Sequence, residues 1–380
     1  MGANNMKILN LKGNRLIVIG TEFSHLPALE ELNLSENRFV TLEQNSFAGL
    51  KNLRKLHMER ITTLISLHVE AFNDLENLSV LSFEGNANLK SFPSTVFSSL
   101  VALEEINLSL VPIEEVLPVI FQNNSELKSI SLTHGMTEFN PDTFSHLIKL
   151  EFFKIRNSFS FEIVNAELFA NNVNLKTLIF NNCNITELSS DSFEKLINLE
   201  EIDLGYNRIE LPDNIFEKNV NLKILKLTST GIVGEMNAEI LKTLTKLEVL
   251  HVDANTIRII DSNLFVNNPE LIDINFTSNR INATQSTFLE NQKKLEILDF
   301  NGNVCVNRRF SGIVDGDLSE IIPLLNECFL NYELSLPSTS TSTIIPETTT
   351  SGSNLINISK YLLIGSFCLD FVAVKLKKLI

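Results

Sequence analysis

An internal repeat of 23 to 25 residues is the feature that most constrains this sequence. The segments that begin at Leu29 and Leu199 both fit L-x-x-L-x-L-x-x-N-x-L, with Phe39, Ile202 and Ile209 in place of Leu. The first apolar position of this pattern recurs thirteen times, at Met6, Leu29, Leu53, Leu78, Leu103, Leu127, Leu150, Leu175, Leu199, Leu222, Leu247, Leu271 and Leu295. A unit this short cannot bury its own apolar side chains, so neighbouring units must stack and cover one another. The sequence therefore predicts a repeat solenoid and not a single globular core.

A phenylalanine marks the same place in most of the units, six residues before the next lead residue. Leu241 takes this place once, and Phe288 lies one residue out of register. The phenylalanines at this place are Phe23, Phe47, Phe72, Phe97, Phe121, Phe144, Phe169, Phe193, Phe216 and Phe265. The chain has 26 Phe but only 3 Tyr and no Trp. We expect these rings to stack through the interior as one column, opposite the Leu column.

The repeat resembles the leucine-rich repeat family, in particular the type of about 24 residues found in extracellular proteins such as Toll-like receptors, Slit and chaoptin. The resemblance extends over residues 6–303. It implies an α/β fold in which the repeats form a horseshoe-shaped solenoid. A parallel β-sheet would line the concave face, and loops and short helices would form the convex face.

The resemblance also implies a ladder of Asn side chains, each of which bonds backbone groups of adjacent turns. Seven repeats keep this residue, as Asn14, Asn37, Asn86, Asn207, Asn255, Asn279 and Asn303. Six others replace it with Ile61, Val111, Gly135, Ser158, Cys183 and Thr230. Ser, Thr and Cys still offer a weak donor, whereas Ile, Val and Gly do not. Four consecutive departures lie in repeats within 103–198, where we expect irregular, more mobile convex loops.

The two ends of the repeat array differ in the sequence that could cover them. The first repeat begins at Met6, so residues 1–5 form only a remnant N-terminal segment without a cap or a signal peptide, and a truncated sequence is the hypothesis that we favour. Residues 304–332 follow the last repeat and contain Cys305 and Cys328. By resemblance to the four-Cys flank of extracellular members, this segment is a C-terminal cap closed by a Cys305–Cys328 disulfide. Two unpaired thiols are the alternative.

The composition changes after the cap. Residues 333–354 form a Ser/Thr/Pro-rich stretch, which predicts an extended stalk. Residues 355–380 are apolar again, but only 14 residues separate Lys360 from Lys375, and Asp370 interrupts them. A spanning helix needs about 20 apolar residues. We favour a weak single membrane span, and we keep a lipid-anchor signal and a merely adhesive tail as alternatives.

No motif for catalysis or for cofactor binding occurs in the sequence. It lacks G-x-S-x-G, H-E-x-x-H, C-x-x-C, P-loop and G-x-G-x-x-G patterns, and its 6 His are scattered. We therefore expect no enzyme activity, no cofactor and no metal site. The net charge of −15 argues against a nucleic acid partner, because phosphate binding needs a basic surface.

A partner-binding site is predicted near the middle of the sheet. Phe152, Lys154 and Arg156 are followed in the next two repeats by Ile179 and Tyr206. An exposed aromatic residue beside cations is typical of an anchor for a protein partner. The alternative is that Phe152 only fills a gap left by an irregular repeat.

Glycosylation sequons are numerous but weakly informative, because Asn, Ser and Thr are all common. They begin at Asn33, Asn77, Asn107, Asn123, Asn184, Asn275, Asn282 and Asn357. The sequence favours an extracellular, membrane-tethered recognition or adhesion glycoprotein that binds a protein or glycan on its concave face. The alternative is a soluble cytoplasmic leucine-rich-repeat scaffold. The ligand and the oligomeric state stay open.

Overall fold

The computed structural model describes residues 5–19, 21–113, 118–133, 140, 142–158, 163–164 and 166–336. The chain divides into two units, Met1–Ser335 and Leu336–Ile380, and nearly all of the described residues belong to the first. The apolar tail and most of the predicted stalk and N-terminal segment lie outside the described residues, as does Gly135. Among the residues that are described, no helix has the length and apolar character to cross a membrane.

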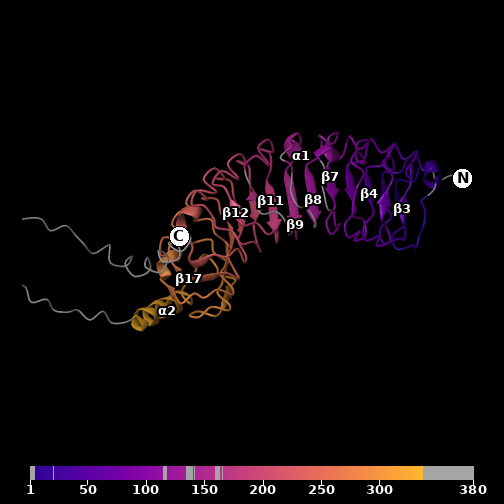
Figure 1. Ribbon diagram of the computed structural model, residues 1–380. Coiled ribbons are helices and arrows are strands. Elements are labelled where there is room, and N and C mark those ends of the chain that lie inside the picture. Colours follow the sequence, from indigo (N-terminus) through magenta and orange to yellow (C-terminus); the bar gives the residue numbers. More distant parts are fainter. Residues whose placement is uncertain are drawn as a thin grey trace, which may run out of the picture. The chain divides into compact units, whose positions relative to one another are not determined.

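One large sheet organises the first unit. It has 14 strands, and its neighbouring strands follow one another along the chain (Figure 1). They are β1 (Ile8–Asn10), β2 (Glu31–Asn33), β4 (Lys55–His57), β6 (Val80–Ser82), β7 (Glu105–Asn107), β8 (Ser129–Thr133), β9 (Phe152–Arg156), β11 (Thr177–Asn181), β13 (Glu201–Asp203), β14 (Ile224–Lys226), β16 (Val249–His251), β18 (Asp273–Asn275), β20 (Ile297–Asp299) and β21 (Arg309–Ser311). All pairs up to β20 are parallel, and β21 joins antiparallel to β20. The predicted solenoid with a parallel sheet is confirmed.

Short elements lie between the strands of the main sheet. Three smaller sheets contain β3 (Thr41–Leu42) with β5 (Ser66–Leu67), β10 (Ile163–Val164) with β12 (Glu187–Leu188), and β15 (Val233–Glu235) with β17 (Thr256–Ile260) and β19 (Ala283–Thr284). The helices are η1 (Thr21–His25), η2 (Pro118–Phe121), α1 (Asp142–Ser145), η3 (Ala238–Leu241), η4 (Ser286–Leu289) and α2 (Ile322–Ser335). Except for α2, each helix is a turn or so long, which fits a unit of about 24 residues.

The interior contains the two predicted columns. The lead leucines from Leu29 to Leu295 are fully buried. The Phe column is confirmed: the rings of Phe47 and Phe72 stack 5.9 Å apart at 9°, and those of Phe193 and Phe216 do so at 8°. Such offset stacking adds about 0.5–1.5 kcal/mol per pair beyond the burial of apolar area.

A further set of phenylalanines, which the repeat pattern did not assign, packs against this column from the strand side. Phe83 meets Phe72 edge-on, and Phe153 meets Phe144 edge-on at 5.0 Å. Phe153 lies on β9 and Phe83 directly follows β6, and both rings are fully buried in the interior. They account for much of the Phe excess.

The backbone turns in the same way after each strand of the main sheet. The residue directly before each described ladder position has a positive φ, between 53° and 77°. These residues are Gly13, Glu36, Arg60, Gly85, Leu110, Asn157, Asn182, Tyr206, Ser229, Ala254, Ser278 and Gly302. Only three of them are Gly, although this left-handed region favours Gly. The stack therefore imposes a left-handed turn on residues that do not prefer it.

The ladder residues bond the preceding turn. Asn86 accepts from the N–H of Ile61 at 2.7 Å and donates to Met58 O, and Asn37, Asn207, Asn255, Asn279 and Asn303 bond the turn before them in the same manner. Asn14 is exposed, and among the described residues its side chain donates to Lys12 O alone. The replacements act as expected where they carry a donor. Thr230 Oγ1 donates to Leu227 O, and Cys183 Sγ lies 3.5 Å from Ile155 O.

A second amide column was not predicted from the sequence. Asn124, Asn172, Asn219 and Asn268 are fully buried, three residues before a lead leucine. Each donates Nδ2 to two carbonyls of the preceding turn, such as Phe97 O and Leu100 O for Asn124. In the sequence, the residue three places before each lead leucine alternates between Leu and Asn from Leu100 to Asn268, so the signal for this column was present there.

The C-terminal end of the stack is covered by β21 and α2. The structure joins Cys305 to Cys328 by a disulfide, with the Cα atoms 5.5 Å apart. Helix α2 contacts β19 and η4 and buries only Leu325 and Cys328 among its residues. It continues to Ser335, three residues beyond the predicted end of the cap.

Candidate functional site

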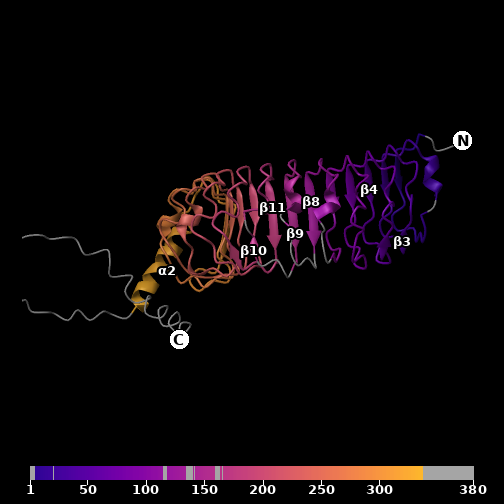
Figure 2. The ribbon, with the colours of Figure 1, turned by 45° about the horizontal axis from the view of Figure 1, so that its top comes forward.

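Three neighbouring strands place most of the predicted site on one face. β8, β9 and β11 are five residues long, whereas most strands of the main sheet have three, and β9 lies between the other two (Figure 2). Phe152, Lys154 and Arg156 alternate along β9, so they share the face opposite the interior. Ile179 is the direct partner of Lys154 on β11. We call these four residues the central patch.

The apolar part of the central patch consists of Phe152 and Ile179. Phe152 is half-buried, and Ile179 is 9% exposed. The next residue, Phe153, is fully buried and makes the ring contacts with the Phe column. Phe153 therefore fills the interior at this repeat, and Phe152 is left on the opposite face with part of its ring in solvent.

The basic part of the central patch consists of Lys154 and Arg156. Burial, together with the neighbouring Arg156 charge, lowers the pKa of Lys154 below its usual value, and Glu84 acts weakly in the opposite direction. Neither cation forms an ion pair with an acidic residue that the structure describes. The patch thus carries two adjacent positive charges on a chain whose net charge is −15.

The structure does not bring Tyr206 into the central patch. Tyr206 has φ 58° in the turn after β13, is 56% exposed, and lines a separate groove of about 640 Å³. Arg208 and Asn184 line the same groove. Tyr206 thus lies in the turn beyond β13 and not on the strand itself, which spacing in the sequence did not reveal.

Three predicted sequons lie on the face of the main sheet, at Asn33, Asn107 and Asn275. Each is half-buried, and its Oδ1 accepts from the N–H two residues later, at 2.9–3.0 Å. None of the three lies on β8, β9 or β11. The sequon positions therefore leave the central patch uncovered.

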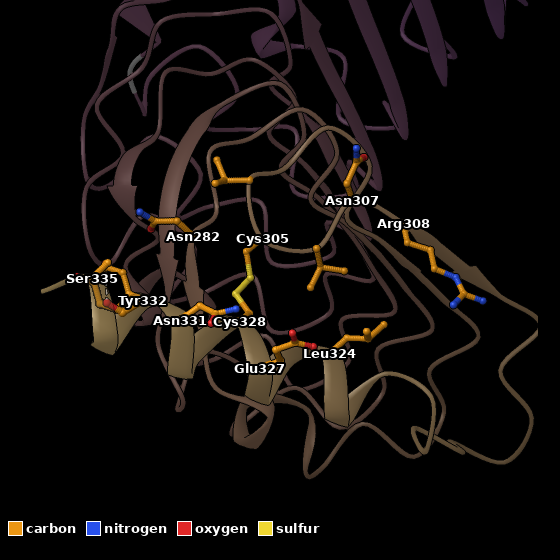
Figure 3. A pocket seen from close by; sticks show the side chains of 12 residues that line it. Asn282, Cys305, Asn307, Arg308, Leu324, Glu327, Cys328, Asn331, Tyr332 and Ser335 are labelled. Carbon is orange, nitrogen blue, oxygen red and sulfur yellow. Dashed lines mark hydrogen bonds between the residues drawn. A yellow bond between two sulfur atoms is a disulfide. The ribbon is translucent and has the colours of Figure 1, made fainter.

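A second groove lies beside the disulfide and was not predicted. It has a volume of about 650 Å³ between the loop at Cys305 and helix α2. In Figure 3, Leu324, Glu327 and Asn331 lie along the helix that carries Cys328, on both sides of that residue. Its lining mixes apolar, acidic, basic and amide side chains, so it favours no single class of ligand.

The chain matches two family models over most of its length. A model described as leucine rich repeat matches residues 4–60, and a model described as BspA type leucine rich repeat region matches residues 40–172, 114–237 and 162–296. Together these matches extend over more than half of the sequence.

Similar curated proteins include receptors. The chain is 28% identical over 244 residues to Toll-like receptor 3 of Bos taurus, covering 60% of this chain and 23% of that protein. It is 33% identical over 128 residues to Tsukushi of Gallus gallus, covering 34% of each. It is 27% identical over 307 residues to podocan of Mus musculus, covering 80% of this chain and 49% of podocan. The chain thus spans less than half the length of each of these relatives.

Similar solved structures share the fold. The Drosophila Toll–Spatzle complex gives a TM-score of 0.62 at 20% identity, covering 77% of this chain and 39% of that one. A repeat protein of Leptospira interrogans gives a TM-score of 0.64 at 23% identity, covering 86% and 83%. At such identities the likeness concerns the architecture of the stacked turns.

Proposed function

Because this chain belongs to the leucine-rich repeat family, we propose that it is a recognition protein that binds a partner protein on the central patch. The observation that carries the proposal is the juxtaposition of a half-exposed aromatic ring, an aliphatic side chain and two cations on adjacent strands. Aromatic residues and Arg are enriched among the residues that dominate binding energy at protein interfaces. The names of two similar proteins, Toll-like receptor and the Toll–Spatzle complex, support a binding role.

The finer parts of the proposal concern location. We propose that the protein acts outside the cell, and the Cys305–Cys328 disulfide supports this because disulfides persist mainly in oxidising compartments. Tethering to a membrane through residues 355–380 is part of the same proposal and is supported by sequence alone. The cytoplasmic scaffold is disfavoured by the same disulfide.

A crosslinking experiment tests the binding site. A photo-crosslinking amino acid replaces Phe152 in one protein and Ile197 in a matched control, since Ile197 is also exposed but lies outside the main sheet. Both proteins are incubated with intact native cells and illuminated. We expect discrete protein adducts from position 152 and not from position 197. Adducts from position 197 alone would contradict the proposal.

A mass comparison tests the location. Protein from native cells is treated with glycosidase, with reductant and with neither. We expect a decrease in mass after deglycosylation and two additional alkylatable thiols after reduction. An unchanged mass together with freely alkylated Cys305 and Cys328 would favour the scaffold.

A further inference from the structure

The two cations of the central patch have neutral neighbours on both sides. In the register of the sheet, Lys154 lies between Ser131 on β8 and Ile179 on β11. Arg156 lies between Thr133 and Asn181 on the same two strands. No adjacent strand therefore offers a carboxylate to either charge.

The nearest described acidic side chains on the other strands of the sheet lie at least two strands from β9. Asp203 is two strands from β9, is 6% exposed, and accepts from the N–H of Gly205 at 2.8 Å. Its oxygens also lie 3.3 Å from Asn181 Nδ2. On the other side, Glu105 lies on β7, two strands from β9, and Glu84 lies in the turn after β6, three strands away, where it has the smallest of the three effects on the pKa of Lys154.

Other basic residues on this face have acidic neighbours. Lys226 pairs with Glu201 at 2.8 Å, and Arg309 pairs with Asp299 at 3.3 Å. Lys55 has Glu31 as its direct partner on β2. Among the described residues, the two cations on β9 thus have no acidic partner on an adjacent strand, whereas these three basic residues do.

We propose that the central patch binds an extended acidic segment of a partner protein, with two carboxylates on Lys154 and Arg156 and one apolar side chain on Phe152 and Ile179. This inference rests on the proposed function and names the chemistry of the partner. Lys154 and Arg156 are two residues apart on a strand, which separates them by about 6.6 Å. Two acidic residues that alternate along an extended segment are separated by the same distance.

A protein segment fits better than a polyanion such as a sulfated glycan. The two cations of the patch suffice for two carboxylates, but a polyanion would meet the repulsion of a chain with net charge −15. The apolar half of the patch also requires an apolar group in the ligand. Complementary charge at such a site increases the association rate and selects among partners.

Synthetic peptides provide the test. The probe is fluorescein-labelled Leu-Ser-Asp-Ser-Asp-Ser, and the matched probe has Asn in place of both Asp. Binding to the full chain is measured by fluorescence anisotropy at low and at physiological salt. The variant K154Q/R156Q removes both charges, and Lys55→Gln removes one positive charge on the same face but four strands away. All three proteins are checked for equal thermal midpoints.

We expect the Asp peptide to bind at least tenfold more tightly than the Asn peptide, and this preference to weaken as salt increases. K154Q/R156Q should abolish the preference, whereas Lys55→Gln should change affinity less than twofold. Equal binding of both peptides would overturn the acidic segment while leaving binding at the patch intact, and binding of neither peptide would also overturn it. Tighter binding of a heparin hexasaccharide than of the Asp peptide would also overturn the proposal and would indicate that the patch binds glycans.

Discussion

Asn207 bonds back across one full turn to Cys183, whose backbone N–H donates to Asn207 Oδ1 at 2.9 Å. The same oxygen accepts from Ile185 N, and Nδ2 donates to Phe180 O and Leu204 O. Nδ2 also donates to Gly205 O at 3.2 Å, so one buried amide bonds five backbone groups of two turns. Asn207 forms these bonds to a turn whose own ladder residue, Cys183, cannot form the same set.

Asn207→Ala should leave these backbone groups buried without partners. Each unpaired buried group costs about 1–3 kcal/mol, so we expect a loss of at least about 3 kcal/mol in the free energy of unfolding. Urea unfolding measures the loss, and hydrogen exchange at the Cys183 amide localises it. Asn14→Ala is the control, because Asn14 is exposed and bonds only within its own turn. Equal losses for the two variants would show that the ladder contributes little.

Ala254→Gly should stabilise the protein. Ala254 is exposed and has φ 54°, a conformation that Gly adopts without the steric penalty of a Cβ atom. We expect a gain of up to about 1 kcal/mol, measured as a higher urea midpoint. Ala238→Gly, in helix η3, should instead destabilise by about 0.5–1 kcal/mol. A lower urea midpoint for Ala254→Gly would contradict the strain that we infer for the residues with positive φ directly before the ladder positions.

The Cys183 thiol should make stability fall at alkaline pH. Burial raises the pKa of this thiol from 9.0 to about 12. Between these values the unfolded chain releases the proton and the folded chain keeps it, so the unfolded state binds fewer protons and the free energy of unfolding decreases as pH rises. The slope from this group is roughly 1 kcal/mol per pH unit.

The difference between wild type and Cys183→Ser isolates this contribution, because the other alkaline groups are common to both proteins. We expect the wild type to lose stability relative to the variant between pH 9 and 10.5. In the same range the native thiol should resist alkylation, and in urea it should react. Parallel pH profiles for the two proteins would contradict the buried neutral thiol.

The Cys305–Cys328 disulfide should hold helix α2 on the end of the stack. The helix buries only Leu325 and Cys328, and the bond closes a segment of 23 residues. A loop of this size stabilises by about 3 kcal/mol in the chain-entropy account. We expect Cys328→Ser to increase hydrogen exchange across α2 and β19, with β1 to β14 unchanged. Unaltered exchange in α2 would mean that packing alone retains the cap.

The candidate site shows where sequence reasoning stopped. Phe152, Lys154 and Arg156 could be placed on one face because they alternate along a strand. Tyr206 could not be separated from them, because its exclusion depends on a positive φ in the turn after β13. The neutral flanks of Lys154 and Arg156 became visible only when the register paired β9 with β8 and β11.

The period of about 24 residues predicted the stacked architecture and the Leu and Phe columns, and the resemblance to leucine-rich repeats implied the parallel sheet. It could do so because each repeat contacts only its neighbours, so that a one-dimensional pattern specifies a one-dimensional stack. Which side chains meet across turns, such as Asn207 with Cys183, became visible only in the folded chain. Those contacts depend on backbone angles and on the register between neighbouring strands. Residues about 24 positions apart in the sequence set both together, so no single repeat reveals them.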